Sequence, residues 1–151
     1  MRYLAGGLLA MSLVFGTARW ANAACDLTQA QLDAARAAAD AACDAEDPPR
    51  GCTTATSHGQ YVSCFVHQVN ANPAVPPECR GAIKRCAARS ICGKQARGFV
   101  TCCKTSSSGT TKCSIKSSAP GCTDHAPAGG SACVGTHPSC CDACTDTGCA
   151  P

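Results

Sequence analysis

The amino-acid sequence predicts a small disulfide-rich α+β fold, in which three short helices are followed by a β-hairpin and loops held by cysteines. Three observations support this prediction. The chain of 151 residues contains 16 cysteines, helical periodicity is confined to its first part, and two strand-like segments joined by a turn follow. Such a cysteine density in a short chain is typical of proteins stabilised by disulfide bonds.

Residues 1–23 have the features of a secretory signal peptide: a positive charge, an apolar stretch and the small-x-small cleavage pattern at Ala21-Asn22-Ala23. The apolar stretch is too short for a permanent membrane span, which takes about 20 residues. We therefore expect a secreted or periplasmic protein with no transmembrane segment in its mature chain. The alternative is a lipoprotein acylated on Cys25, although Asn22 stands where such a protein has a large aliphatic residue.

The first helix is predicted to begin at Thr28. Thr28 and Gln31 have the spacing of a capping box, and Leu27 and Leu32 that of a hydrophobic staple. The alanine-rich stretch that follows favours helix. Prolines at positions 48 and 49 end the segment.

A second capping box opens at Ser57, and large apolar residues recur at Tyr61, Phe65 and Val69, which lie on one face of a helix. This helix is predicted to end in residues 70–73, at a proline.

The third helix is predicted to start after Pro76 and Pro77, because proline suits a first turn. It should carry Cys86 and Cys92 and end at Gly93 as its C-cap.

The chain divides here into a helical half, 24–93, and a β/loop half, 94–151. In the second half, residues 99–104 and 110–115 are predicted strands joined by a turn at 106–109. From Ser117 onward, glycine, proline, serine and threonine dominate, which indicates irregular loops fixed at cysteines.

All the cysteines are predicted to form disulfides. The mature chain has only fourteen large apolar residues, so bridges should supply much of its stability, and we expect no stable fold after reduction. The helical half holds seven cysteines and the other half nine. Both counts are odd, so full pairing requires at least one bridge between the halves. Connectivity stays open, since 16 cysteines allow roughly two million pairings. Direct neighbours are not expected to bond to each other. The predicted disulfide residues are Cys25, Cys43, Cys52, Cys64, Cys79, Cys86, Cys92, Cys102, Cys103, Cys113, Cys122, Cys133, Cys140, Cys141, Cys144 and Cys149.

Charge is distributed unevenly. Residues 24–78 contain seven acids and two bases, whereas residues 79–151 contain nine bases and three acids. On the third predicted helix, four bases form two rows with a spacing of four, and we predict that they bind anions: Arg80, Lys84, Arg85 and Arg89. The partner would be an anionic lipid or glycan. Nucleic acid is not expected, because the basic stretch offers one aromatic side chain for stacking.

The competing interpretation, which the sequence favours, is that the acidic end of the first helix faces these bases while the remaining bases are solvated. Catalytic signatures such as Gly-x-Ser-x-Gly or His-Glu-x-x-His are missing from the sequence. We therefore expect no enzyme, cofactor or metal. The C-x-x-C motif from Cys141 to Cys144 fits ordinary bridging best, with a metal site or a redox pair as alternatives.

The spacing Cys133-x6-Cys140-Cys141-x2-Cys144-x4-Cys149, with a further cysteine at 122, resembles inhibitor-knot (knottin) peptides in cysteine order. This resemblance implies a rigid platform that presents loops such as 135–138. Residues 58–64 and parts of 133–144 resemble uncharacterised exported bacterial proteins, which implies no particular activity. Together these features predict an exported, disulfide-stabilised binding or structural module. The alternatives are a metal-sequestering cysteine-rich protein and an inhibitor or toxin-like module.

Overall fold

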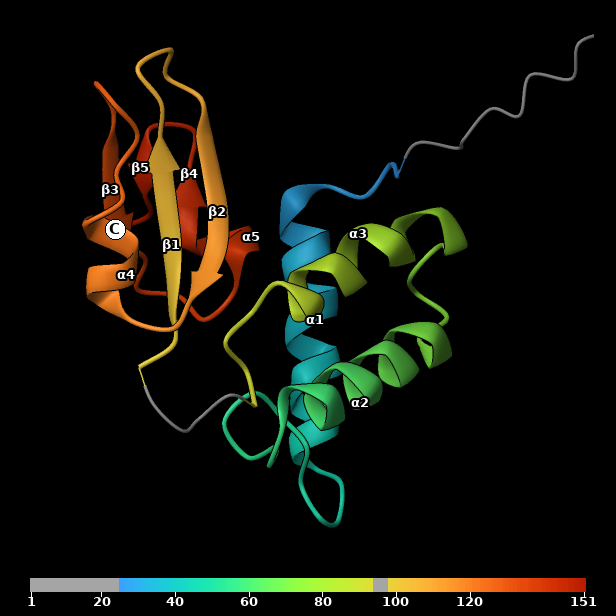
Figure 1. Ribbon diagram of the computed structural model, residues 1–151. Helices are drawn as coiled ribbons and strands as arrows, with labels where there is room; N and C mark the ends of the chain where they lie inside the picture. Colours follow the sequence, from blue (N-terminus) through green and yellow to red (C-terminus); the bar gives the residue numbers. More distant parts are fainter. Residues whose placement is uncertain (1–24, 94–97) are drawn as a thin grey trace, which may run out of the picture.

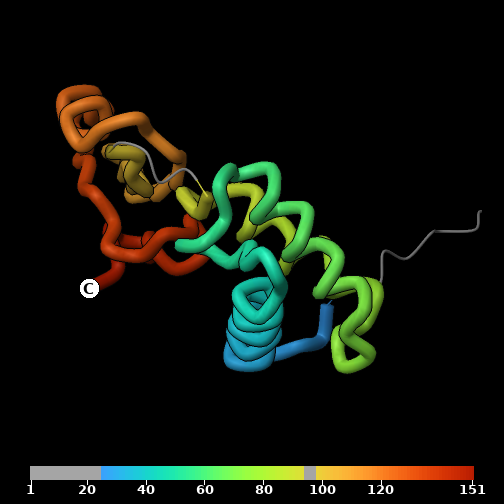
Figure 2. Tube along the Cα trace, turned by 90° about the horizontal axis from the view of Figure 1, so that it is seen from below, coloured from blue at the N-terminus to red at the C-terminus, as the bar shows by residue number. Residues whose placement is uncertain are grey.

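The computed structural model describes residues 25–93 and 98–151 and shows a small disulfide-rich α+β fold, as predicted (Figure 1). The helical half contains α1 (Gln29–Asp44), α2 (His58–Ala71) and α3 (Pro77–Ala88). The second half, called the sheet half below, contains β1 (Val100–Thr105), β2 (Thr111–Lys116), α4 (Ala119–Thr123), β3 (Ser131–Val134), α5 (Cys140–Ala143), β4 (Cys144–Thr145) and β5 (Gly148–Cys149). In two perpendicular views the halves lie side by side (Figures 1 and 2), and in Figure 1 α5 lies at the side of the sheet half that faces the helices.

The capping signals place the starts of the first two helices. Both hydrogen bonds of the box at Thr28 are present: the Gln31 amide donates to Thr28 Oγ1 at 3.3 Å, and the Thr28 amide donates to Gln31 Oε1 at 2.8 Å. At α2, Ser57 Oγ accepts from the Gln60 amide at 3.2 Å, while the Gln60 side chain accepts from the Thr56 hydroxyl. Local side-chain chemistry therefore sets where α1 and α2 begin.

The third helix is shorter than predicted, because α3 ends at Ala88 and Cys92 lies beyond it. Gly93 is not its C-cap. Its φ of +66° is one that other residues rarely adopt, and a Cβ at this position would lie 2.4 Å from the Ser57 carbonyl oxygen. The Gly93 amide donates to the Cys52 carbonyl at 2.9 Å. Glycine is thus required where this loop passes close to the start of α2.

A three-stranded antiparallel sheet with the order β2-β1-β3 forms the centre of the sheet half. The predicted hairpin is present one residue later than expected, with Gly109 at φ +80° in its turn. The expectation of irregular loops after Ser117 is wrong: β3, the two short helices and the β4-β5 pair all occur there. In the register of the sheet, Cys103 lies opposite both Cys113 and Cys133.

Every cysteine is in a disulfide, as predicted. The eight bridges are Cys25–Cys79, Cys43–Cys64, Cys52–Cys92, Cys86–Cys141, Cys102–Cys122, Cys103–Cys144, Cys113–Cys140 and Cys133–Cys149. Adjacent cysteines bond to different partners, which confirms that expectation. One bridge, Cys86–Cys141, joins the two halves, as the odd cysteine counts require.

The predicted signal peptide, residues 1–23, lies outside the described residues, as does the segment 94–97, with which the second predicted half begins. Cys25 forms a bridge with Cys79, so its sulfur is not available for acylation, which contradicts the lipoprotein alternative. Within the described ranges, no helix has the length and apolar character needed to cross a membrane.

The tail is not a self-contained knotted unit. Six cysteines lie between positions 122 and 149, and a knottin-type module would need three bridges among them. Only Cys133–Cys149 closes within this segment, while the other four bridges leave it, including the one to Cys86 in α3. The predicted resemblance in cysteine order therefore does not extend to an independent tail.

Candidate anion-binding groove

The two halves meet where α5 and the loop before it dock against α3. The Ile91 amide donates to the Pro138 carbonyl at 2.8 Å, and the Cys140 amide donates to the Arg89 carbonyl at 2.9 Å. Ser139 Oγ donates to the Cys86 carbonyl at 3.1 Å. Together with the Cys86–Cys141 bridge, these bonds fix the position of α5 relative to α1 and α3.

A groove of about 360 Å³ lies at this junction. Three arginines line it together with apolar side chains and the interhalf bridge: Arg36, Arg85, Arg89, Leu32, Ala82, Ile83, Cys86 and Cys141. We call it the arginine groove. Gln29 is the remaining residue that lines it, so no carboxylate belongs to its lining in the described part of the chain.

The three arginines differ in how they are held. Arg36 is 13% exposed, forms ion pairs with Asp33 and Asp142, and donates from Nη1 to Cys86 Sγ at 3.5 Å. Arg89 donates to the Cys113 carbonyl, which connects it to β2. Arg85 is exposed, and its side chain has no hydrogen bond or ion pair with another described residue. Its guanidinium therefore has its full set of donors available for a ligand.

The four predicted anion-binding residues do not lie together. Arg85 and Arg89 line the groove, whereas Arg80 and Lys84 do not. A helix turns by about 100° per residue, so the row of Arg80 and Lys84 lies about 140° around α3 from the row of Arg85 and Arg89. Arg80 Nε instead donates to the Val75 carbonyl at 3.2 Å.

Sequence analysis missed Arg36, which comes from α1 in the acidic part of the sequence. No local signal distinguishes it from an ordinary surface base. Its place in the site depends on how α1 packs against α3 and on the ion pair with Asp142, 106 residues away.

The favoured alternative, that the acidic end of the first helix faces the α3 bases, is wrong for the described residues. The Asp40 carboxylate accepts from the Cys52 amide at 3.0 Å, and Asp44 accepts from the Thr54 hydroxyl at 2.6 Å. Glu46 pairs with Arg50, four residues further along the chain. An ion pair does join the halves, but it is Arg36–Asp142, with the base in the helical half and the acid in the sheet half. The predicted attraction had the acids in the first helix and the bases further along the chain.

A second cavity, of about 390 Å³, shares Arg36 with the arginine groove. Asp40, Tyr61 and His137 line this second cavity as well. Burial, the largest effect, and the nearby Asp44 raise the pKa of Asp40 above its ordinary value of 3.8, although the Cys52 amide and the Tyr61 hydroxyl oppose them. Burial, followed by the charge of Asp40, also raises the pKa of Tyr61. Tyr61 therefore stays protonated at neutral pH and serves as a hydrogen-bond donor.

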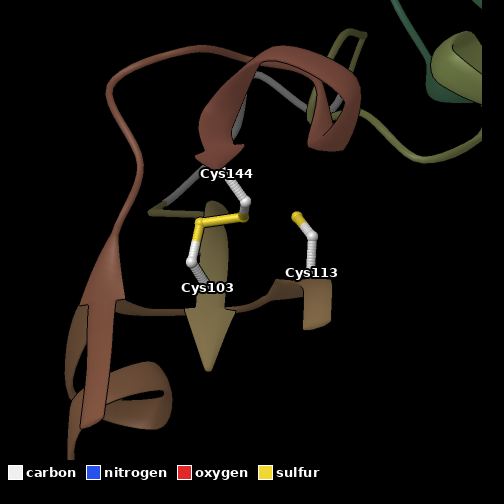
Figure 3. A group of neighbouring side chains, drawn as sticks. All are labelled: Cys103, Cys113 and Cys144. Carbon is white, nitrogen blue, oxygen red and sulfur yellow. A yellow bond between two sulfur atoms is a disulfide. The ribbon is translucent and has the colours of Figure 1, made fainter. Parts of the chain in front are cut away.

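Sulfur atoms are concentrated in the sheet half. The Sγ atoms of Cys103, Cys113 and Cys144 lie within 4.8 Å of one another, as do those of Cys103, Cys133 and Cys149. Figure 3 shows the first group, in which Cys103 and Cys144 are bonded and Cys113 points toward them. Metals bind thiolates, and each of these sulfurs is held in a disulfide.

The two cysteines of the C-x-x-C motif bond to different partners, Cys141 to Cys86 and Cys144 to Cys103. They do not form a redox pair with each other, and their predicted role in ordinary bridging is confirmed.

The chain matches no protein-family model, no curated protein and no solved structure.

Proposed function

We propose that the chain is an exported, disulfide-stabilised binding module whose arginine groove holds the anionic headgroup of a lipid. The observation that supports it is the meeting of Arg36, Arg85 and Arg89, from two helices, in a cavity without a lining carboxylate. Guanidinium groups bind phosphate through two parallel hydrogen bonds. Eight bridges are typical of proteins from oxidising compartments, which supports a secreted or periplasmic location.

The apolar side chains that line the groove favour a lipid over a glycan. Leu32 and Ala82 offer apolar surface on which the aliphatic part of a lipid can rest. A glycan presents hydroxyl groups, and each needs a polar partner once it leaves water. Gln29 is the one uncharged polar side chain that lines the groove, so a sugar would find few such partners.

Vesicle binding tests this proposal. The full-length mature protein, with its bridges intact, should bind vesicles that contain phosphatidylglycerol, and vesicles of phosphatidylcholine alone should bind weakly. Because exposed charges are screened, binding should fall as ionic strength rises to about 0.5 M. We expect Arg85→Glu to weaken binding about tenfold, since it replaces a charge-assisted hydrogen bond by repulsion.

Lys84→Glu is the matched control, because it makes a similar charge change on the neighbouring residue, outside the groove. It should bind like the wild type. Equal losses for Arg85→Glu and Lys84→Glu would show that net charge, and not the groove, drives binding. Binding to a sulfated polysaccharide but not to vesicles would refute the lipid and assign a glycan instead. Absence of salt-sensitive binding to either would refute the proposal.

A further inference from the structure

The interhalf bridge Cys86–Cys141 differs from the other seven bridges in its accessibility. Cys141 is the one exposed cysteine of the sixteen, all of which lie in the described ranges. Its partner Cys86 is 5% exposed. Both residues line the arginine groove. A dissolved molecule in the groove can therefore reach this bridge from the Cys141 side.

The charges around the bridge favour a negatively charged reactant. Arg85 and Arg89 line the same cavity, and the Arg85 side chain has no hydrogen bond or ion pair with another described residue. Clefts lined by one sign of charge raise the local concentration of the opposite ion. Arg36 donates to Cys86 Sγ at 3.5 Å, and a neighbouring cation stabilises a thiolate relative to a thiol. Asp33 and Asp142 both pair with Arg36, so one guanidinium faces two carboxylates. The positive charge that remains for a ligand of the groove therefore comes from Arg85 and Arg89.

We infer that Cys86–Cys141 is a site of thiol–disulfide exchange with small anionic thiols, such as those that carry a carboxylate or a sulfonate. The thiolate of the small molecule attacks Cys141 Sγ, the Cys86–Cys141 bond breaks, and Cys86 leaves as a thiolate beside Arg36. Cys141 then carries a mixed disulfide with the small molecule. A second thiolate attacks this mixed disulfide, releases Cys141 as a thiolate, and forms the oxidised dimer of the small thiol.

Electrons balance in this sequence, because two thiols lose two electrons as one disulfide of the protein gains them. The leaving group is the buried sulfur that already accepts a hydrogen bond from a guanidinium. A leaving thiol with a lower pKa departs faster. The reaction therefore uses both features that distinguish this bridge, the accessible Cys141 and the cation beside Cys86.

The product differs from the resting protein in how its halves are joined. Cys86–Cys141 is the one disulfide between them. After it opens, the hydrogen bonds from Ile91 to Pro138 and from Cys140 to Arg89 remain, together with the Arg36–Asp142 ion pair. Such contacts resemble a transient interface, so the halves should become able to move relative to each other.

The test compares two thiols of opposite charge, mercaptoethanesulfonate and cysteamine, at equal concentrations of thiolate. Native protein is exposed briefly, quenched and alkylated, and its modified cysteines are identified by mass spectrometry. Cys86 and Cys141 should be modified first, and the anionic thiol should react about tenfold faster at low ionic strength. Arg85→Glu should abolish or reverse this preference, while Lys84→Glu should retain it.

First reaction at another bridge, or equal rates for the two thiols with the wild type, would overturn the inference. The inference uses the charge of the same groove as the proposed function but requires no lipid. Vesicle binding by the same variants therefore separates the two. Failure to bind vesicles with an intact thiol preference refutes lipid binding alone, and vesicle binding without any reaction at Cys86–Cys141 refutes the exchange site alone.

Discussion

The two halves of the molecule are filled by different kinds of atoms. In the helical half, the buried core consists of large apolar side chains such as Phe65, Val69, Val75 and Ile83, each at most 2% exposed. No large apolar side chain is buried in the described part of the sheet half. The buried side chains there are Thr101, Cys102, Cys103, Cys122, Cys140 and Ala143. The helical half buries cysteines as well, namely Cys43, Cys64, Cys79, Cys86 and Cys92. The difference is that its core combines hydrocarbon with disulfides, whereas the described core of the sheet half consists mainly of disulfides.

This difference separates two roles of a disulfide. In the helical half a bridge acts mainly as a cross-link, because apolar burial of ~1.5–3 kcal/mol per large side chain already favours the folded state. In the sheet half the sulfurs also occupy the space where Val, Leu or Phe would otherwise lie. Cys103 shows this most clearly, with sulfurs of two neighbouring bridges within 4.8 Å of its own.

The largest effect should come from reduction of every bridge. We expect the whole chain to lose cooperative unfolding, since the apolar core alone is small for the length of the chain. Any residual amide protection should be confined to α2 and α3, which carry most of the hydrocarbon core. Hydrogen exchange followed by mass spectrometry, with and without reductant, measures this. Protection of β1 and β2 in the reduced protein would contradict the disulfide core.

Removal of a single bridge should have a smaller effect on stability. It can separate the role of a disulfide as a cross-link from its role in filling the core. Cys52–Cys92 and Cys103–Cys144 close loops of nearly equal length, with separations of 40 and 41 residues. Loop entropy therefore predicts equal losses for removing either bridge, within the usual ~2–5 kcal/mol. Each bridge has one buried cysteine, Cys92 or Cys103, so both double variants leave a void. We expect C103A/C144A to lose more than C52A/C92A, because no large apolar side chain is buried in the described part of the sheet half to pack into that void.

Denaturant unfolding of both double variants measures the two losses. Equal losses would mean that the sulfurs of the sheet half act as cross-links and not as a core. The bridges left in each variant should be mapped first, so that both retain seven native pairs.

The elements that the sequence predicts well are those set by neighbouring residues. Thr28 and Ser57 cap their helices through side chains three residues away, and Gly109 marks the hairpin turn. The elements that the sequence does not predict are positioned by residues far away along the chain. β3 has four residues without an alternating pattern, and its place follows from pairing with β1. α5 is held by a bridge that spans 55 residues.

In the candidate site, too, the sequence predicts what neighbouring residues set and misses what distant contacts set. Arg85 and Arg89 are predictable because they share one helix face. Arg80 and Lys84 form a separate row about 140° around α3, and they do not line the groove. Arg36 could not be found from its neighbours, because its place in the groove depends on α1 packing against α3 and on the sheet half docking at Asp142.

The smallest predicted effect concerns pH, and it belongs to the helical half. Burial raises the pKa of Asp40 above 3.8 in the folded protein, so the folded state binds this proton more tightly than the unfolded state. The contribution of Asp40 to stability is therefore fully present below pH 3.8 and is lost as pH rises through the higher, folded pKa. Asp40→Asn, which cannot ionise, should be more stable than the wild type at neutral pH. That advantage should shrink toward acid pH.

Denaturant unfolding with the bridges intact, between about pH 3 and about pH 7, measures this difference. Asp146→Asn, the same chemical change at an exposed residue of the sheet half, is the control. A stability difference for Asp40→Asn that is constant with pH would mean that its carboxyl is as well solvated in the folded chain as in the unfolded one. The second cavity, which Asp40 lines, would then be open to water. Burial would in that case contribute less at this position of the helical half than its apolar core suggests.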